Sequence, residues 1–257
     1  MEKYFFNKLL IEKNSVVFTW DDNFSAHFET IAPIFLEFKY RCSFYINPGE
    51  TDFIKKYYRG YKAIHDANFE IGSHGYTHHH FSKYDNTAYS YQLSKSKEII
   101  KEYFGTNPTT FAFPHHDFTE EMLKKAKCFY FETRNTLSHS KRFSLKTNSS
   151  MEQIKSALED TCENGQDLIF SGHSISNKLH SIEECGYEPI SIRFLINILY
   201  FLSENQNIQV CTFEEACLKN YIKYNCIHTN MMFELTKSDL EYLEKYGLGK
   251  ERILEII

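Results

Sequence analysis

The segment Ser15-Val-Val-Phe-Thr-Trp-Asp-Asp-Asn23 begins as an apolar run and stops abruptly at two carboxylates. The run is typical of a β-strand that is covered on both faces. Asp21 and Asp22 follow where that strand ends, and neighbouring side chains on an extended chain point in different directions. The two carboxylates are therefore able to do different work. On its own the segment is also typical of an Asp-Asn turn, so the rest of the chain decides between a turn and a site.

Strand-like and helix-like segments alternate along the chain after this point. Such alternation indicates a parallel sheet whose strands are joined by crossover helices. About seven or eight such units, with no Gly-x-Gly-x-x-Gly, favour a closed or nearly closed α/β barrel over an open dinucleotide-binding sheet. Residues 1–225 are expected to form the barrel, and residues 226–257 a C-terminal helical extension packed on the barrel or at an oligomer contact.

The predicted strands after the first are 41–46, 69–73, 110–113, 129–132, 142–145, 167–171 and 208–212. The predicted helices are 24–38, 55–67, 87–104, 119–127, 150–163, 191–205 and 213–224, followed in the extension by 235–246 and 250–257.

Composition narrows the class of protein. The chain has 257 residues, 42% of them hydrophobic, which is enough for one sizeable core. A net charge of −5 without any basic run argues against nucleic acid as a partner. The seven cysteines are scattered and form no Cys-x-x-Cys, which predicts reduced thiols. We see no signal peptide and no membrane-spanning stretch, and we expect a cytoplasmic protein.

Histidines concentrate just after predicted strands, where parallel α/β barrels carry their sites. His74 and His78 are four residues apart, a spacing that places two imidazoles on one face of a helical turn. With one carboxylate from the first strand they would form a catalytic metal site with open positions rather than a closed structural one. The histidines assigned instead to the surface or the core are His27, His65, His139, His180 and His228.

Four segments resemble the motifs of one family. Thr19-Trp-Asp-Asp-Asn23 resembles the Thr-Phe-Asp-Asp-Gly motif of the polysaccharide deacetylases, also called the NodB homology group or carbohydrate esterase family 4. Ser73 to His78 resembles their His-[Ser/Thr]-x-x-His motif, and Phe111 to His116 their Arg-x-Pro-x-Gly motif. Leu168 to His173 resembles their last motif, an apolar strand that ends in His. The resemblance spans roughly residues 14–218 and implies a distorted (β/α)7–8 barrel of the NodB type.

The resemblance also implies roles for the residues at matching positions. Asp22 would bind a divalent metal ion together with His74 and His78. Asp21 would be the general base and His173 the general acid. Zn²⁺ is the expected ion, with Co²⁺, Ni²⁺ or Mn²⁺ as alternatives.

The third motif departs most from the family's pattern. Ala112 stands where the family has the Arg that contacts the catalytic Asp, and Arg142 is the replacement we predict for it. Asn23 replaces a Gly, and Asn tolerates a positive φ, so that turn is expected to survive. The backbone N–H of His115 is expected to face the oxyanion. The other residues expected around the substrate are Trp20, Tyr76, Pro114 and His116.

These observations predict a metal-dependent hydrolase that removes an acetyl group from an N-acetylated amino sugar or glycan precursor. A cytosolic sugar nucleotide or lipid-linked precursor is favoured over a mature wall polymer. The altered third motif keeps two alternatives open, an amide or imide hydrolase on a small non-sugar substrate and a non-catalytic glycan- or metal-binding barrel. Neither nucleic acid nor a membrane span is expected, and the extension is a candidate homo-oligomer contact.

Overall fold

The structure is a computed structural model that describes residues 4–50, 52–176, 188–228 and 232–256. His180, assigned above to the surface or the core, lies outside the described residues. None of the described helices is long and apolar enough to cross a membrane.

One curled parallel sheet organises the molecule, as predicted. Its strands lie in the order β6-β5-β4-β3-β2-β8-β7, and β11 also pairs with β2. β11 pairs with the first half of β2, residues 14–17, whereas β3 pairs with residues 19–21. Among the described residues no pairing joins β6 to β7, so the barrel is open there. The strands are β2 (Asn14–Asp21), β3 (Ser43–Ile46), β4 (Glu70–Ser73), β5 (Thr110–Phe111), β6 (Glu132–Thr133), β7 (Ser140–Ser144), β8 (Asp167–Gly172) and β11 (Ile208–Cys211).

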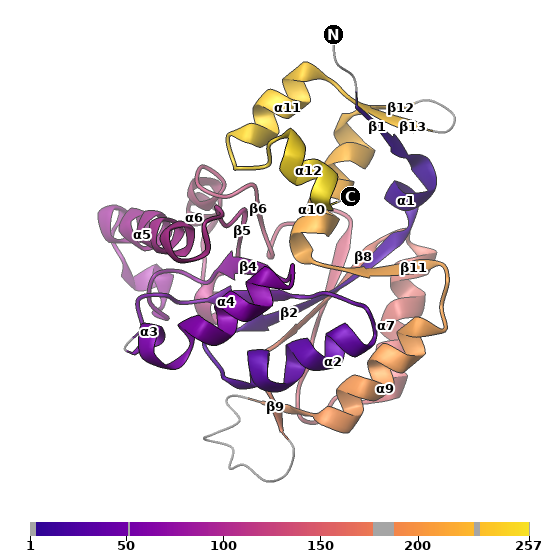
Figure 1. Ribbon diagram of the computed structural model, residues 1–257, viewed down its shortest axis with the longest axis horizontal. Helices are drawn as coiled ribbons and strands as arrows, with labels where there is room; N and C mark the ends of the chain where they lie inside the picture. The colour runs from indigo at the N-terminus through magenta and orange to yellow at the C-terminus, as the bar shows by residue number, and fades with distance from the viewer. Residues whose placement is uncertain (1–3, 51, 177–187, 229–231, 257) are drawn as a thin grey trace.

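Helices connect and cover these strands (Figure 1). They are α2 (Ala32–Glu37), α3 (Phe53–Lys56), α4 (Tyr58–Asp66), α5 (Asn86–Phe104), α6 (Glu120–Ala126), α7 (Met151–Glu163), α9 (Ile192–Ser203) and α10 (Phe213–Asn225). A π-helix at His27–Ile31 precedes α2, and 3₁₀ turns lie at Phe81–Lys83 and Pro114–His116. A short parallel pair, β9 (Ile175–Ser176) and β10 (Ile190–Ser191), lies beyond β8. The predicted helix 55–67 is two helices, because the backbone of Tyr57, between α3 and α4, is not helical.

β2 is buried on both faces, as its apolar run predicted. Val16, Phe18 and Trp20 belong to one hydrophobic cluster, which includes residues of α2, α7 and α9. Val17 belongs to a second cluster, together with residues of α10 and the C-terminal segment. Alternation along the strand therefore places Thr19 and Asp21 on the same face as Val17.

The N-terminal and C-terminal segments pair with each other, which the sequence did not predict. β1 (Tyr4–Asn7) pairs antiparallel with β13 (Met232–Leu235), which also pairs with β12 (Ile227–His228). α1 (Lys8–Glu12), α11 (Lys237–Glu244) and α12 (Lys250–Ile256) complete this end of the molecule. Figure 1 shows the yellow helices α11 and α12 beside the indigo strand β1. The extension is thus part strand and part helix; its separation at residue 225 and its oligomer contact stay predictions.

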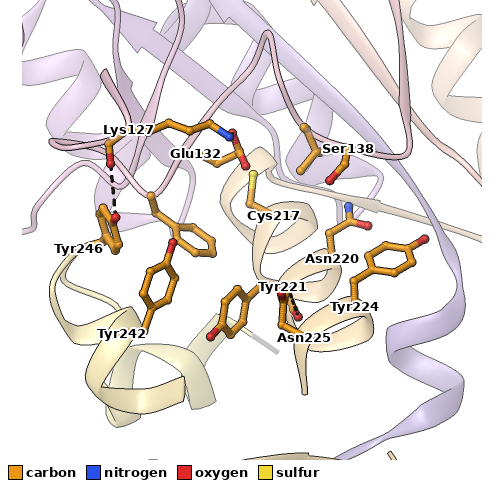
Figure 2. A pocket seen from close by; sticks show the side chains of 12 residues that line it. Lys127, Glu132, Ser138, Cys217, Asn220, Tyr221, Tyr224, Asn225, Tyr242 and Tyr246 are labelled. Atoms are coloured by element: carbon orange, nitrogen blue, oxygen red, sulfur yellow. Dashed lines mark hydrogen bonds and ion pairs between the residues drawn. The ribbon is translucent and has the colours of Figure 1, made fainter. Parts of the chain in front are cut away.

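A cavity of about 410 Å³ lies between this segment and the barrel. Figure 2 shows it lined by Tyr221 of α10, Tyr242 of α11 and Glu132 of β6, among others. The rings of Tyr221 and Tyr242 stack at 5.4 Å. None of the predicted site residues lines this cavity.

Glu70 joins three elements at the opposite end of the strands from the site. Its carboxylate accepts hydrogen bonds from Ser43 Oγ of β3 at 2.6 Å, from the Glu214 backbone N–H of α10 at 2.8 Å and from Thr110 Oγ1 of β5. Burial, followed by the nearby charge of Glu214, raises the pKa of Glu70 to about 7. The carboxyl is therefore partly protonated at neutral pH, although the hydrogen bonds favour its charged form.

The raised pKa of Glu70 predicts a pH-dependent loss of stability. As the pH rises from about 4.5 to about 7, the unfolded chain gives up this proton before the folded one does, so the free energy of unfolding falls across that window. Glu70→Gln keeps the shape without the charge. Its stability relative to the wild type is expected to increase by up to about 3 kcal/mol between pH 4.5 and pH 8. Urea denaturation at several pH values measures this, with the exposed Glu98→Gln as control. A difference between Glu70→Gln and wild type that does not change with pH would contradict it.

Candidate active site

Asp22, His74 and His78 meet beyond the carboxyl ends of β2 and β4. Asp22 Oδ1 lies 3.1 Å from His78 Nε2 and 3.6 Å from His74 Nε2. One possible ligand atom from each residue lies within 4.8 Å of the others. Asp22 Oδ1 is buried and accepts no hydrogen bond, which is costly unless a cation compensates it. Two imidazoles and one carboxylate with open positions fit a divalent ion such as Zn²⁺.

The His74 ring is held in the tautomer that a metal ligand needs, and the loop that carries His78 is fixed by a backbone contact. His74 Nδ1 lies 2.8 Å from the carbonyl oxygen of Ala112, so Nδ1 carries the proton and Nε2 is left bare toward Asp22. The backbone N–H of His78 donates to Glu50 Oε1 at 2.8 Å and fixes its loop. Burial lowers the pKa of His74 to about 3 and also lowers that of His78. Both rings are therefore neutral at pH 7.

The turn after β2 places its strained residue one position earlier than expected. Asp22 has a φ of 70°, in the left-handed region, whereas Asn23 is not among the residues with positive φ. The expectation that Asn23 takes the positive φ is wrong. Asn23 instead exchanges hydrogen bonds with the backbone of Asn47, its Nδ2 donating to Asn47 O at 2.9 Å and its Oδ1 accepting from Asn47 N at 3.2 Å. Asn47 in turn donates to the carbonyl of His74. These amides tie together the ends of β2, β3 and β4.

Asp21 pairs with Arg134, so the prediction of Arg142 as its partner is wrong. Arg134 Nη1 and Nη2 donate to the two carboxylate oxygens at 2.5 and 2.6 Å, and Nη1 also donates to Thr19 Oγ1 at 3.0 Å. Both side chains are buried. Burial alone would raise the pKa of Asp21, but the Arg134 charge outweighs it and holds that pKa well below its usual range. Asp21 is thus a fixed, ionised carboxylate.

Arg134 follows β6 directly, and β6 pairs with β5, the strand that precedes Ala112. The signal that would have found it is the one that identified the other candidates, a polar residue just after a predicted strand. Arg142 lies on β7, where its guanidinium contacts the ring nitrogens of His116 at 2.8 and 3.0 Å.

His173 follows the carboxyl end of β8, as predicted from the strand 167–171. Among the smaller effects on the two carboxyl groups, the charge of His173 lowers the pKa of both Asp21 and Asp22. Burial, and then the charge of Asp21, raises the pKa of Asp22. The Asp21 carboxylate, the candidate cation-binding set of Asp22, His74 and His78, and the His173 imidazole thus follow the carboxyl ends of β2, β4 and β8.

The third motif forms a 3₁₀ turn that exposes two histidines. His115 and His116 have φ values of 54° and 56°. The positive φ of His116 explains why the family's Arg-x-Pro-x-Gly motif has Gly at the matching position. The His115 ring lies 4.3 Å from that of His78 and stacks on that of His80 at 4.0 Å. Pro114 is buried beneath them.

Two residues expected around the substrate lie elsewhere or deeper. Trp20 has no exposed surface, and its ring packs against Gly172, so its expected place in the cleft is wrong. The alternation of β2 explains this, because Trp20 faces the helices whereas Asp21 faces the site. Tyr76 is half-buried and meets Tyr91 edge to face at 5.9 Å.

Comparisons with known proteins bear on the sequence motifs and on the fold. Residues 11–133 match the sequence model of the family described as Polysaccharide deacetylase. No curated protein matches the chain. Among solved structures, the Xyl-CE4 domain of a multidomain xylanase from the hindgut metagenome of Trinervitermes trinervoides is 13% identical, with a TM-score of 0.56 over 84% of this chain and 93% of that one.

Two further structures share the fold. Peptidoglycan deacetylase PdaC from Bacillus subtilis is 16% identical, with a TM-score of 0.53 over 80% of this chain and 91% of that one. A mutant of BA3943, a CE4 family pseudoenzyme from Bacillus anthracis, with restored enzymatic activity, is 20% identical, with a TM-score of 0.54 over 80% and 68%. The sequence match at residues 11–133 and this shared fold bear out the resemblance to the polysaccharide deacetylases of the carbohydrate esterase family 4 type.

Proposed function

We propose that the protein is a metal-dependent hydrolase that removes the acetyl group from an N-acetylated amino sugar or glycan precursor. The observation that carries this proposal is the meeting of Asp22, His74 and His78 beside a fixed Asp21–Arg134 pair. One structural relative, BA3943, is a pseudoenzyme, so the proposal depends on whether this chain has all the residue types that catalysis needs. Here every residue type that the chemistry needs is present at a strand end.

Asp22, His74 and His78 would hold the divalent ion, with Zn²⁺ the first choice and Co²⁺, Ni²⁺ or Mn²⁺ as alternatives. Such an ion, when bound, polarises an acetyl carbonyl and lowers the pKa of a water. Asp21, oriented by Arg134, takes the proton of the attacking water. The backbone N–H of His115 faces the developing oxyanion. His173 gives its proton to the departing amine, without which the amide C–N bond would not break.

The exposed Arg142 at the edge of the site favours an anionic precursor over a neutral polymer as the substrate. Arg142 is exposed, and within the described part of the chain it contacts the His116 ring and no carboxylate. A guanidinium pairs well with phosphate or carboxylate oxygens. The six cysteines within the described ranges are free thiols, which supports a reducing compartment and hence a cytosolic sugar nucleotide or lipid-linked precursor.

Acetate release tests the function directly. Protein stripped of metal and reloaded with Zn²⁺, Co²⁺ or Mn²⁺ would be given an N-acetylhexosamine, its nucleoside-diphosphate form, a chitooligosaccharide and a cyclic amide. Metal-dependent acetate release from the N-acetylated sugars is expected. Hydrolysis of the cyclic amide alone would favour the imide hydrolase, and metal binding without any turnover would favour the non-catalytic barrel.

Arg142→Gln tests the choice of an anionic substrate. KM for the nucleoside-diphosphate sugar is expected to rise by about 10-fold or more, because one charge-assisted contact is lost. KM for the neutral N-acetylhexosamine is expected to stay the same. Lys141→Gln, one residue away on β7 and paired with Asp160, is the control. Equal changes in KM for both substrates would contradict the proposed preference for an anionic substrate.

A further inference from the structure

His27 is a buried histidine that the proposed chemistry does not use. It has no exposed surface, and it begins the π-helix His27–Ile31 between β2 and α2. Short π-helical turns are rare and often occur at functional sites. The sequence assigned His27 to the surface or the core, with no further role.

Both ring nitrogens of His27 are engaged. Nε2 lies 2.6 Å from the backbone carbonyl oxygen of His173, and Nδ1 lies 2.8 Å from the hydroxyl of Tyr61. A carbonyl only accepts hydrogen bonds, so Nε2 carries the proton. Burial lowers the pKa of His27 to about 4, so the ring is neutral and Nδ1 is the acceptor. The tautomer is thus dictated by its surroundings.

Tyr61 continues the contact to the other side of the site. Its hydroxyl also lies 3.0 Å from the backbone carbonyl oxygen of Asp22, so one proton serves two acceptors. Asp22 is the residue with a φ of 70°, a conformation that costs free energy for a residue with a Cβ. A hydrogen bond to its carbonyl favours that conformation. The series His173, His27, Tyr61, Asp22 therefore joins the ends of β8 and β2.

Packing holds both rings of this series in place. The His27 ring lies 5.1 Å from that of Phe44 on β3, and the Tyr61 ring stacks on Phe53 at 5.9 Å. Tyr61 is fully buried in α4. Neither ring is free to turn away from its partners, so the two carbonyls are held at a fixed separation.

We propose that His27 and Tyr61 are positioning residues that form a buried brace between the backbones of His173 and Asp22. The brace sets where the His173 imidazole stands relative to the carboxylate of Asp22. This inference rests on the proposed function, in which Asp22 holds the ion and His173 supplies the proton. Neither brace residue touches substrate in this proposal.

Tyr61→Phe tests the arm to Asp22 without any substrate. Zn²⁺ affinity, measured by competition with a chromophoric chelator, is expected to fall about 10- to 100-fold, the usual effect of losing an outer contact to a ligand. Tyr58→Phe is the matched control. Tyr58 is on α4, as Tyr61 is, and its hydroxyl donates to the backbone carbonyl of Tyr103 on α5 at 3.3 Å. Equal affinities in the two variants would overturn the brace, whatever the enzyme's substrate.

His27→Phe and His27→Gln test the arm to His173. The Gln carboxamide keeps a donor for the His173 carbonyl, whereas Phe removes it. We expect His27→Phe to lower kcat at saturating Zn²⁺ by about 10-fold or more with KM unchanged. The same variant should shift the limb of the pH–rate profile that reports the general acid. His27→Gln should recover most of the rate. His65→Gln, whose ring contacts Thr106, is the control.

The proposal requires both arms. Equal kcat losses in His27→Phe and His27→Gln, with no change in the pH profile, would reduce His27 to a packing residue and overturn the brace. A wild-type protein that binds Zn²⁺ but releases no acetate would instead contradict the proposed function, and the Tyr61→Phe affinity would still decide the brace.

Discussion

Asp21→Asn is expected to abolish acetate release while leaving one metal ion bound. The carboxylate accepts two hydrogen bonds from Arg134 and lies beside, not within, the set formed by Asp22, His74 and His78. An asparagine amide is not a base, so kcat should fall by roughly 10²- to 10⁴-fold, the usual contribution of a general base. Metal content by mass spectrometry and kcat by acetate assay measure the two effects separately.

Asp22→Asn is the reciprocal variant, and it should lose the metal. Asp160→Asn, an exposed aspartate paired with Lys141, is the control for handling and should keep both metal and activity. Asp21→Asn leaves Arg134 buried without its partner, so its thermal unfolding must be recorded beside its activity. If Asp21→Asn loses the metal and Asp22→Asn keeps it, the two roles are reversed.

The strand ends were predictable because each rests on a local pattern. An apolar run followed by Asp21 and Asp22, or by His74, needs only the chain's own periodicity and the rule that parallel barrels carry sites at the carboxyl ends of strands. The comparisons bear out the family resemblance of these segments and the distorted barrel that they predicted. The chain order of strands and helices followed from the same local signals.

What the sequence left undetermined depends on contacts between distant segments. Arg134 and Asp21 are separated by 113 residues, and the long side chain of Arg134, just after β6, reaches the Asp21 carboxylate. The side chain of Arg142, the partner predicted from the sequence, contacts His116 instead. The pairing of β1 with β13 joins the two ends of the chain. Trp20 shows the opposite failure, since strand alternation alone would have placed it away from Asp21.

Arg134→Gln is expected to be the most destabilising of the variants at the site. The change leaves the Asp21 carboxylate buried without a cation, and breaking one side of a buried ion pair typically costs about 3–5 kcal/mol. Without the guanidinium, the main influence that lowers the pKa of Asp21 is lost and burial raises that pKa, so the carboxyl group is easier to protonate. The free energy of unfolding from urea titration and kcat/KM should therefore both fall.

Arg142→Gln is the matched control, because it removes the same charge from the partner predicted from sequence. It should change the free energy of unfolding by less than about 1 kcal/mol, as expected for an exposed residue. The double variant Asp21→Asn/Arg134→Gln removes both charges of the pair, and it should be less destabilised than the sum of the two single variants. Strict additivity, or equal losses in Arg134→Gln and Arg142→Gln, would mean that Arg134 does not hold Asp21 in solution. The double variant should remain inactive even where its stability recovers, because stability depends on matching the two charges whereas turnover needs the carboxylate itself.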